Sequence, residues 1–208
     1  MDALTGPLLG PERLLGAYAA GLFPMADPER GGEVGLYHVD PRAVIPLDAF
    51  RVPRSVARAA RRAPYEIALD RAFDEVVAAC AAGREDGEWL SAELRDAYAV
   101  LHALGFAHSV ECWHEGRLVG GLFGVALGGL FTSESMFHRA SDAGSLALVA
   151  TAERLRACRF TLWDVQTASP HTRRFGAVEI PASEYRRRLG AALALRRELA
   201  PLSPRRAP

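Results

Sequence analysis

The sequence predicts an α/β (α+β) domain with a mixed sheet, and three observations lead to this prediction. Strand-like and helix-like segments alternate from residue 65 onward. A long hairpin pattern covers residues 107–129, which requires antiparallel strands. One helical segment separates the strand-like segments 130–137 and 160–166, and such a crossover makes two strands parallel. Parallel and antiparallel pairs in one chain give a mixed sheet.

The first 62 residues are expected to form a smaller part of the molecule. The predicted elements there are a helix over 11–20, a Pro/Gly-rich loop over 22–35, strands over 36–39 and 43–47, and a helix over 51–62. Pro64 ends the last helix, because the residue before a proline avoids helical conformation. We therefore expect a small N-terminal domain over 1–62 and a main domain over 63–208.

The main domain is expected to contain most of the secondary structure. The predicted elements are strands over 65–69, 130–137, 160–166 and 178–181, the hairpin over 107–129, and helices over 71–82, 92–104 and 144–158, followed by a short helix that ends at Gly176 and a last helix from residue 183. Asp70 and Ser91 precede two of the helices and are predicted to cap them.

The composition is that of a soluble protein with a sizeable core. Of the 208 residues, half are hydrophobic and 24% are charged, and no apolar run is long enough to span a membrane. An acid at position 2 and no basic stretch near the start argue against a secretory signal. Cys80, Cys112 and Cys158 show no C-x-x-C spacing, so we expect reduced thiols and a cytoplasmic protein rather than disulfides or a zinc site.

Charge alone indicates no class of partner. The 25 basic residues balance 25 acidic residues, and every basic residue is Arg because the sequence contains no Lys. It also contains no Asn, which we interpret as a compositional drift of the source genome. The number of Arg residues therefore does not indicate nucleic acid, and only a local cluster of them does.

Polar side chains occupy the ends of two predicted strands. Alternation places Thr132, Glu134 and Met136 on one face of their strand. The second strand begins with apolar residues and ends with Asp164 and Gln166 on one face. Because sheets with parallel strands bind ligands at carboxyl ends, we expect Glu134, Asp164 and Gln166 to meet in one pocket. The structural alternative is that each acid caps a helix or pairs with an Arg.

A stripe of Arg residues lies on the predicted helix over 51–62. Arg54, Arg58, Arg61 and Arg62 are spaced i, i+4, i+7 and i+8, which is one helix face, and the segment contains no acid. Such a stripe suits phosphate groups, because guanidinium binds them in a bidentate manner. A solvated helix face is the other interpretation, and the spacing leaves both open.

Six segments, taken in order, resemble the leucyl/phenylalanyl-tRNA–protein transferase family. They are "ERLLGAYAAGLFPM", "DPRAV", "GEWLS", "GFAHSVECW", "LVGGLFGVALGGLFTSESMF" and the "WDVQ…H…FGAVEIP" segment. The resemblance implies a main domain of the acetyltransferase-like (GNAT) fold. It implies transfer of Leu or Phe from Leu-tRNA or Phe-tRNA to the amine of proteins that start with Arg or Lys, which marks them for N-degron degradation. No cofactor or metal is implied, and we expect a monomer.

The resemblance also implies roles for individual residues. As catalytic residues, Asp164 and Gln166 match the pair that holds the acceptor amine and relays its proton, and Glu134 matches the glutamate that orients the site and adds negative charge. Leu122, Phe131, Met136 and Leu148 would line the pocket for Leu or Phe. Trp89 matches a tryptophan near the terminal adenosine, and Met25 stands where many members have Trp. The stripe of Arg54, Arg58, Arg61 and Arg62 matches the basic helix that would hold the acceptor stem.

Some positions depart from the family pattern, and two other functions remain to be compared. Leu36 and Tyr37 precede "HVDPR" where the family often has an aromatic pair, and Thr151 stands where some members have Phe. We therefore expect adenosine to be held differently, by Trp89 and Tyr37. An acyl-CoA-dependent N-acyltransferase of a small amine is the main alternative. The segment "HRASDAGS" lacks the usual start of a CoA pyrophosphate loop, which argues against it. A noncatalytic RNA-binding module would leave the polar strand ends without a purpose.

Overall fold

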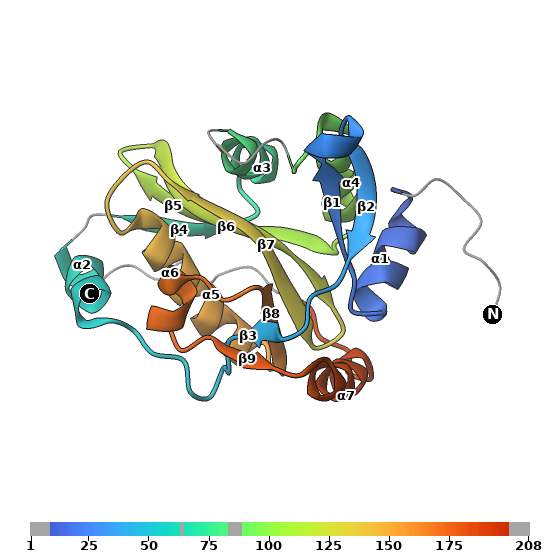
Figure 1. Ribbon diagram of the computed structural model, residues 1–208. Helices are drawn as coiled ribbons and strands as arrows, with labels where there is room; N and C mark the ends of the chain where they lie inside the picture. The colour runs from blue at the N-terminus through green and yellow to red at the C-terminus, as the bar shows by residue number, and fades with distance from the viewer. Residues whose placement is uncertain (1–8, 63–64, 83–88, 200–208) are drawn as a thin grey trace.

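The computed structural model describes residues 9–62, 65–82 and 89–199, and its centre is a seven-stranded sheet (Figure 1). The strand order is β4-β5-β6-β7-β8-β3-β9. Its strands are β3 (Arg42–Val44), β4 (Glu66–Leu69), β5 (Ala107–His114), β6 (Arg117–Leu127), β7 (Leu130–His138), β8 (Leu162–Gln166) and β9 (Val178–Ile180). Strands β7 and β8 are parallel and every other pair is antiparallel, which confirms the predicted mixed sheet.

Helices cover both faces of this sheet (Figure 1). They are α1 (Pro11–Ala19), α2 (Arg54–Arg62), α3 (Phe73–Ala81), α4 (Ala92–Ala103), α5 (Ala143–Ala157), α6 (Pro170–Arg174) and α7 (Ala182–Leu193). One core joins α5 to side chains such as Leu122, and a second core joins α1, α3 and α4 to side chains such as Phe123. These neighbours on β6 point to opposite faces, as strand alternation requires. Helix α7 packs on a smaller group around β3, β8 and β9.

The loop predicted over 22–35 is wrong, because this segment begins a two-stranded antiparallel sheet. Strand β1 (Phe23–Asp27) pairs with β2 (Glu33–Tyr37), and the short 3₁₀ helix η1 (Pro28–Arg30) joins them. Two glycines with positive φ, Gly31 and Gly32, complete the turn. The prolines suggested a loop, but a two-stranded sheet has open edges where the missing N–H of a proline interrupts no ladder.

One of the two predicted helix caps is confirmed and the other is wrong. Ser91 accepts a hydrogen bond from the Leu94 N–H at 3.3 Å and caps α4. Asp70 does not cap α3, whose N-cap is Ala72 with its N–H bound to the Glu111 carboxylate at 2.9 Å. The carboxylate of Asp70 instead accepts the Ser109 N–H at 2.8 Å and lies 2.7 Å from the Nδ1 of His108. Asp70 therefore binds residues of the neighbouring strand β5 and does not cap the helix that follows it in the sequence.

Strand β3 lies between β8 and β9, although it precedes them by more than a hundred residues. It comes from the part of the chain for which a small N-terminal domain was predicted. The domain boundary after residue 62 stays a prediction. Strand β3, which precedes that boundary, belongs to the seven-stranded sheet.

Strand β7 contains a β-bulge at Glu134. Phe123 pairs with Ser135 and Gly124 pairs with Ser133, so Glu134 is the extra residue. Strand alternation shifts there, and Met136 packs against the same core as Phe131. The predicted common face of Thr132, Glu134 and Met136 is therefore wrong, since a bulge re-aims the side chains that follow it.

Candidate active site

A cavity of about 490 Å³ lies where β7 and β8 part. The two strands pair from Leu130 and Leu162 to Thr132 and Asp164, and β7 then continues to His138 paired only with β6. The cavity walls come from the β1–β2 hairpin, the start of the α4 segment and the two strand ends. The lining residues include Phe23, Met25, Tyr37, Trp89, Glu134 and Gln166. A volume of this size accommodates a small molecule or a side chain with its flanking groups.

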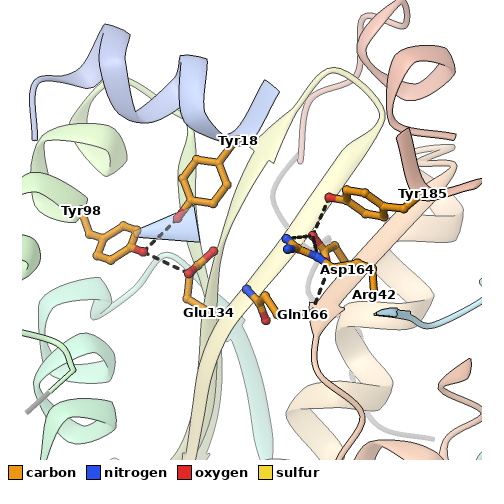
Figure 2. Close-up of polar contacts among 7 residues, drawn as sticks. All are labelled: Tyr18, Arg42, Tyr98, Glu134, Asp164, Gln166 and Tyr185. Carbon is orange, nitrogen blue, oxygen red and sulfur yellow. Dashed lines mark hydrogen bonds and ion pairs between the residues drawn. The ribbon is translucent and has the colours of Figure 1, made fainter. Parts of the chain in front are cut away.

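Glu134 enters this cavity from the bulge, and two tyrosines hold it from behind (Figure 2). Tyr98 donates to Glu134 Oε2 at 3.0 Å, and the Tyr18 hydroxyl lies 2.9 Å from that of Tyr98. Because the single proton of Tyr98 goes to Glu134, Tyr18 donates to Tyr98. Oε1 of Glu134 is buried and has no hydrogen-bond partner among the described residues. One carboxylate oxygen is therefore left for a ligand.

The electrostatics of Glu134 favour its protonated form near neutral pH. Burial raises the pKa of this carboxyl from 4.5 to about 8, while hydrogen bonding by the Tyr18 and Tyr98 hydroxyls opposes the change. Burial, with the nearby charge of Glu134, also raises the pKa of both tyrosines well above 10. The tyrosines thus remain hydrogen-bond donors, and Glu134 is the group that exchanges a proton in the neutral range.

Asp164 lies beneath the cavity floor and is fully buried. Its carboxylate accepts hydrogen bonds from Arg42 Nη2 at 2.6 Å, from Arg42 Nε at 2.9 Å and from the Tyr185 hydroxyl at 2.7 Å. Asp164 is not among the described residues that line the cavity. Without this carboxylate the buried guanidinium of Arg42 would have no counter-charge, which is costly. We call Arg42, Asp164 and Tyr185 the Asp164 cluster.

Gln166 connects the Asp164 cluster to the cavity. Its backbone N–H donates to Asp164 Oδ1 at 2.9 Å, and its φ of 54° lies in the left-handed region. A residue other than glycine adopts this conformation only where its surroundings hold it. Figure 2 shows Gln166 between Glu134 and Asp164. Glu134 and Gln166 therefore line the same cavity. Asp164 lies below it and binds the backbone N–H of Gln166.

The other predicted site residues fall into three environments. Met25 and Trp89 line the cavity. Leu122, Phe131 and Leu148 are buried in the core beside α5, and Met136 is half-buried against them. Arg54, Arg58 and Arg61 are exposed on α2, while the side chain of Arg62 lies outside the described part of the structure.

Four residues of the site were not predicted from the sequence. They are Tyr98, which donates to Glu134, Tyr18, which is hydrogen-bonded to Tyr98, and Arg42 and Tyr185, which donate to Asp164. A buried carboxylate requires donors, so the existence of partners was predictable, but their identity was not. The one local signal was Arg42 directly before the apolar segment "AVI".

The described residues contain no group of three or more His, Cys, Asp or Glu side chains arranged to hold a metal ion. Cys112 is buried, and burial raises the pKa of its thiol to about 12, which keeps it protonated and unreactive. The same part of the chain has no helix with the length and apolar character needed to cross a membrane.

An enzyme that transfers an acyl group to an amine needs a proton acceptor of suitable pKa and polar groups that orient the amine. The cavity is lined by a buried carboxyl, Glu134, and a polar amide, Gln166, which are groups of the kinds that this class uses. Residues 44–190 match the family described as "Leucyl/phenylalanyl-tRNA protein transferase", and residues 8–40 match its N-terminal domain. The chain belongs to this family and is an aminoacyltransferase.

Curated relatives that carry the family name are similar along most of their length. One from Akkermansia muciniphila is 52% identical over 89% of this chain and 96% of its own. One from Rubrobacter xylanophilus is 52% identical over 92% and 99%, and one from Phenylobacterium zucineum is 53% identical over 87% and 83%.

Solved structures are less similar. L-PGS from Bacillus licheniformis has a TM-score of 0.46 and 13% identity over 64% of this chain and 47% of its own. A ribosomal-protein-alanine N-acetyltransferase from Brucella melitensis has a TM-score of 0.37 and 15% identity over 51% and 81%. At these TM-scores, neither structure defines the fold or the activity.

Proposed function

We propose that the chain transfers Leu or Phe from Leu-tRNA or Phe-tRNA to the N-terminal amine of proteins that begin with Arg or Lys. The product would be a substrate for N-degron degradation, and the reaction would take place in the cytoplasm with a monomeric enzyme. Family membership supports the reaction type. The observation that carries the proposal is the buried, unpartnered Oε1 of Glu134 in an otherwise uncharged cavity.

The cavity suits a cationic acceptor. Glu134 is the one acidic side chain among the described lining residues, and aromatic rings such as Phe23 and Trp89 form the walls. An Arg or Lys side chain carries a long apolar stem and a cationic end, which match aromatic walls and a carboxylate. An acceptor that begins with Asp would place a carboxylate beside the buried Glu134 carboxyl with no cation to offset it, and is disfavoured.

The chemistry requires that the acceptor amine lose a proton before it reacts. The amine nitrogen attacks the ester carbonyl, the C–N bond forms, the bond to the ribose oxygen breaks, and that oxygen leaves with a proton. An α-ammonium has a pKa of about 7.7–8.0, close to the value of about 8 for Glu134. Because the two pKa values are close, the ionised fraction of Glu134 can accept the proton at little cost, and this fraction grows as pH rises toward 8.

Gln166 and Asp164 have different roles in this proposal. The Gln166 side chain orients the amine in the cavity, and much of the rate comes from that positioning. Asp164 is a positioning residue, because its carboxylate binds the Gln166 N–H and is already occupied by Arg42 and Tyr185.

The donor would use the remaining predicted residues. The Leu or Phe side chain would pack among Leu122, Phe131, Met136 and Leu148, where the half-buried, unbranched Met136 adapts to either shape. Trp89, with Tyr37 and Met25, would contact the terminal adenosine. The exposed Arg54, Arg58 and Arg61 of α2, with Arg62, would bind phosphates of the acceptor stem. The acetyltransferase-like (GNAT) fold of the main domain is part of this proposal.

The test is transfer of labelled Leu or Phe from the charged tRNA to peptides that begin with Arg, Lys, Asp or Ala. The wild type should modify the Arg and Lys peptides. Glu134→Gln should lose a factor of about 10² or more in kcat/KM, which is typical of a lost acid–base group. The matched control is Glu153→Gln on the exposed part of α5, which should be unchanged.

Asp164→Ala is a poor first variant, because removing one partner of a buried ion pair costs about 3–5 kcal/mol of stability. If folded wild type transfers neither amino acid to any peptide, the proposal is wrong. Calorimetry with acyl-CoA would then test the N-acyltransferase alternative.

A further inference from the structure

Arg42 joins four elements of the fold at one point beneath the cavity. It belongs to β3, its guanidinium binds Asp164 of β8, and it lies between two aromatic rings. The ring centroids of Phe23 on β1 and Tyr185 on α7 are 5.0 Å and 4.8 Å from Arg42 Cζ. A guanidinium bound by a carboxylate and in contact with two aromatic rings has little freedom to move.

Tyr185 completes the surroundings of the carboxylate. Its hydroxyl donates to Asp164 Oδ2 at 2.7 Å, and the residue is 4% exposed. The neighbouring Oδ1 accepts the Gln166 N–H. Both oxygens of Asp164 therefore accept hydrogen bonds, from Arg42, Tyr185 and the Gln166 N–H. The bonds from Arg42 and Tyr185 fix the orientation of the carboxylate, and this orientation determines where the Gln166 N–H lies.

The Gln166 turn depends on this arrangement. A left-handed φ at a residue other than glycine persists where surrounding contacts determine it. Gln166 is in register with Ala43 of β3, and its N–H also donates to the Asp164 carboxylate, which anchors the end of β8 from below. A movement of Asp164 would release the turn and take the Gln166 side chain away from Glu134 in the cavity (Figure 2).

We propose that Arg42 and Tyr185 are positioning residues of aminoacyl transfer, acting through Asp164 to hold Gln166 in place. This inference rests on the proposed function, since it assigns Gln166 to the orientation of the acceptor amine. Neither residue lines the cavity among the described residues, so neither touches the substrate. Phe23 does line the cavity, and its ring contacts Arg42, so one wall and the floor are held by the same guanidinium.

The first test uses Tyr185→Phe, which removes one hydroxyl and keeps the ring over Arg42. We expect kcat to fall about tenfold with the KM values for charged tRNA and peptide unchanged. The control is Tyr65→Phe, which removes a hydroxyl that donates to the Ser141 carbonyl at 3.2 Å, away from the cavity. It should leave both constants unchanged. A loss of activity that follows the folded fraction of Tyr185→Phe in thermal melts would overturn the proposal.

A double-mutant cycle then separates action through Gln166 from an independent effect. In a Gln166→Ala background, Tyr185→Phe and Arg42→Lys should cause no further loss of kcat. Losses that multiply would overturn the proposal.

Hydrogen exchange of the Gln166 amide gives a readout that needs no substrate. It should be faster in Tyr185→Phe than in wild type, and an unchanged rate would overturn the positioning role. Absence of transfer by the wild type would instead count against the proposed function, while the exchange rates would still decide the role of the Asp164 cluster in holding Gln166.

Discussion

At the scale of single residues, the site contains two carboxylates in opposite electrostatic situations. Asp164 is neutralised by Arg42, whereas Glu134 receives a hydrogen bond from the uncharged Tyr98 and faces a cavity. Burial away from a bonded cation favours the protonated form of Glu134, whereas the Asp164 carboxylate is held in an ion pair. The two acids thus differ in their partners and in their exposure to the cavity, which is the basis of the different roles proposed for them.

The raised pKa of Glu134 predicts a particular pH dependence of stability. Between pH 4.5 and about 8 the folded carboxyl keeps its proton while the unfolded one loses it, so the free energy of unfolding falls as pH rises. The effect is on the order of 5 kcal/mol across this window. Glu134→Gln lacks it, so the variant should become more stable relative to wild type from pH 5 to pH 9.

Urea unfolding at pH 5, 7 and 9 measures this difference, with Glu153→Gln as the control for a lost exposed carboxyl. If the wild-type and Glu134→Gln stabilities run parallel with pH, Glu134 titrates alike in the folded and unfolded chains. That result would also remove the argument for Glu134 as a proton acceptor.

Sequence patterns predicted which polar residues lie in the site but did not predict which side chains bind them. Alternation and the crossover were enough to place Glu134 near Gln166, because both follow from local pattern. The pairing of Asp164 with Arg42 joins residues 122 positions apart in a chain with 25 Arg residues. No local pattern selects that partner, so the division of roles between the two carboxylates was not predictable.

At the scale of elements, the bulge in β7 determines where Glu134 points. The pattern of "LFTSESMF" reads as regular alternation, and an extra residue in a strand leaves no mark in such a pattern. Gly124 on β6 is a partial signal. A Cβ there would lie 2.3 Å from the Thr132 carbonyl oxygen, so the neighbouring backbone approaches as closely as glycine allows. Close approach of this kind was visible only in three dimensions.

Helix α2 gives a prediction about ionic strength. If its exposed Arg residues bind phosphates, the Arg54→Ala/Arg58→Ala variant should bind charged tRNA more weakly. The slope of log affinity against log salt should decrease by about 1.4–1.8, since each phosphate contact contributes about 0.7–0.9. Arg117→Ala/Arg186→Ala removes the same charge from exposed positions on the β5–β6 turn and α7. Equal slopes for the two variants would exclude α2 from the tRNA surface.

At the scale of the whole molecule, the position of β3 bears on how the chain divides. Residues 42–44 fill the gap between β8 and β9 and supply Arg42 to Asp164. A fragment over 63–208 would lose this strand and leave a buried carboxylate without its cation. We expect that fragment not to fold, as measured by a thermal transition in circular dichroism. A cooperative transition would instead support an independent main domain that begins at residue 63.

The fold class was predictable, whereas this topology was not. Alternating segments, the hairpin and one crossover were enough to indicate a mixed sheet. The partners of a three-residue strand are set by distant backbone and leave no periodicity to detect. The family matches over 8–40 and 44–190 meet close to β3, and neither match indicates that the strand joins the later sheet.

The Asp164 cluster takes Arg42 from early in the chain and Tyr185 from near its end. During synthesis, therefore, the cavity floor is completed only when Tyr185 has left the ribosome. We expect truncated translation products that end before α7 to be inactive, even where they contain every residue that lines the cavity. The enzyme should therefore become active only when synthesis has passed Tyr185, although its proposed substrate, charged tRNA, is present at the ribosome throughout synthesis.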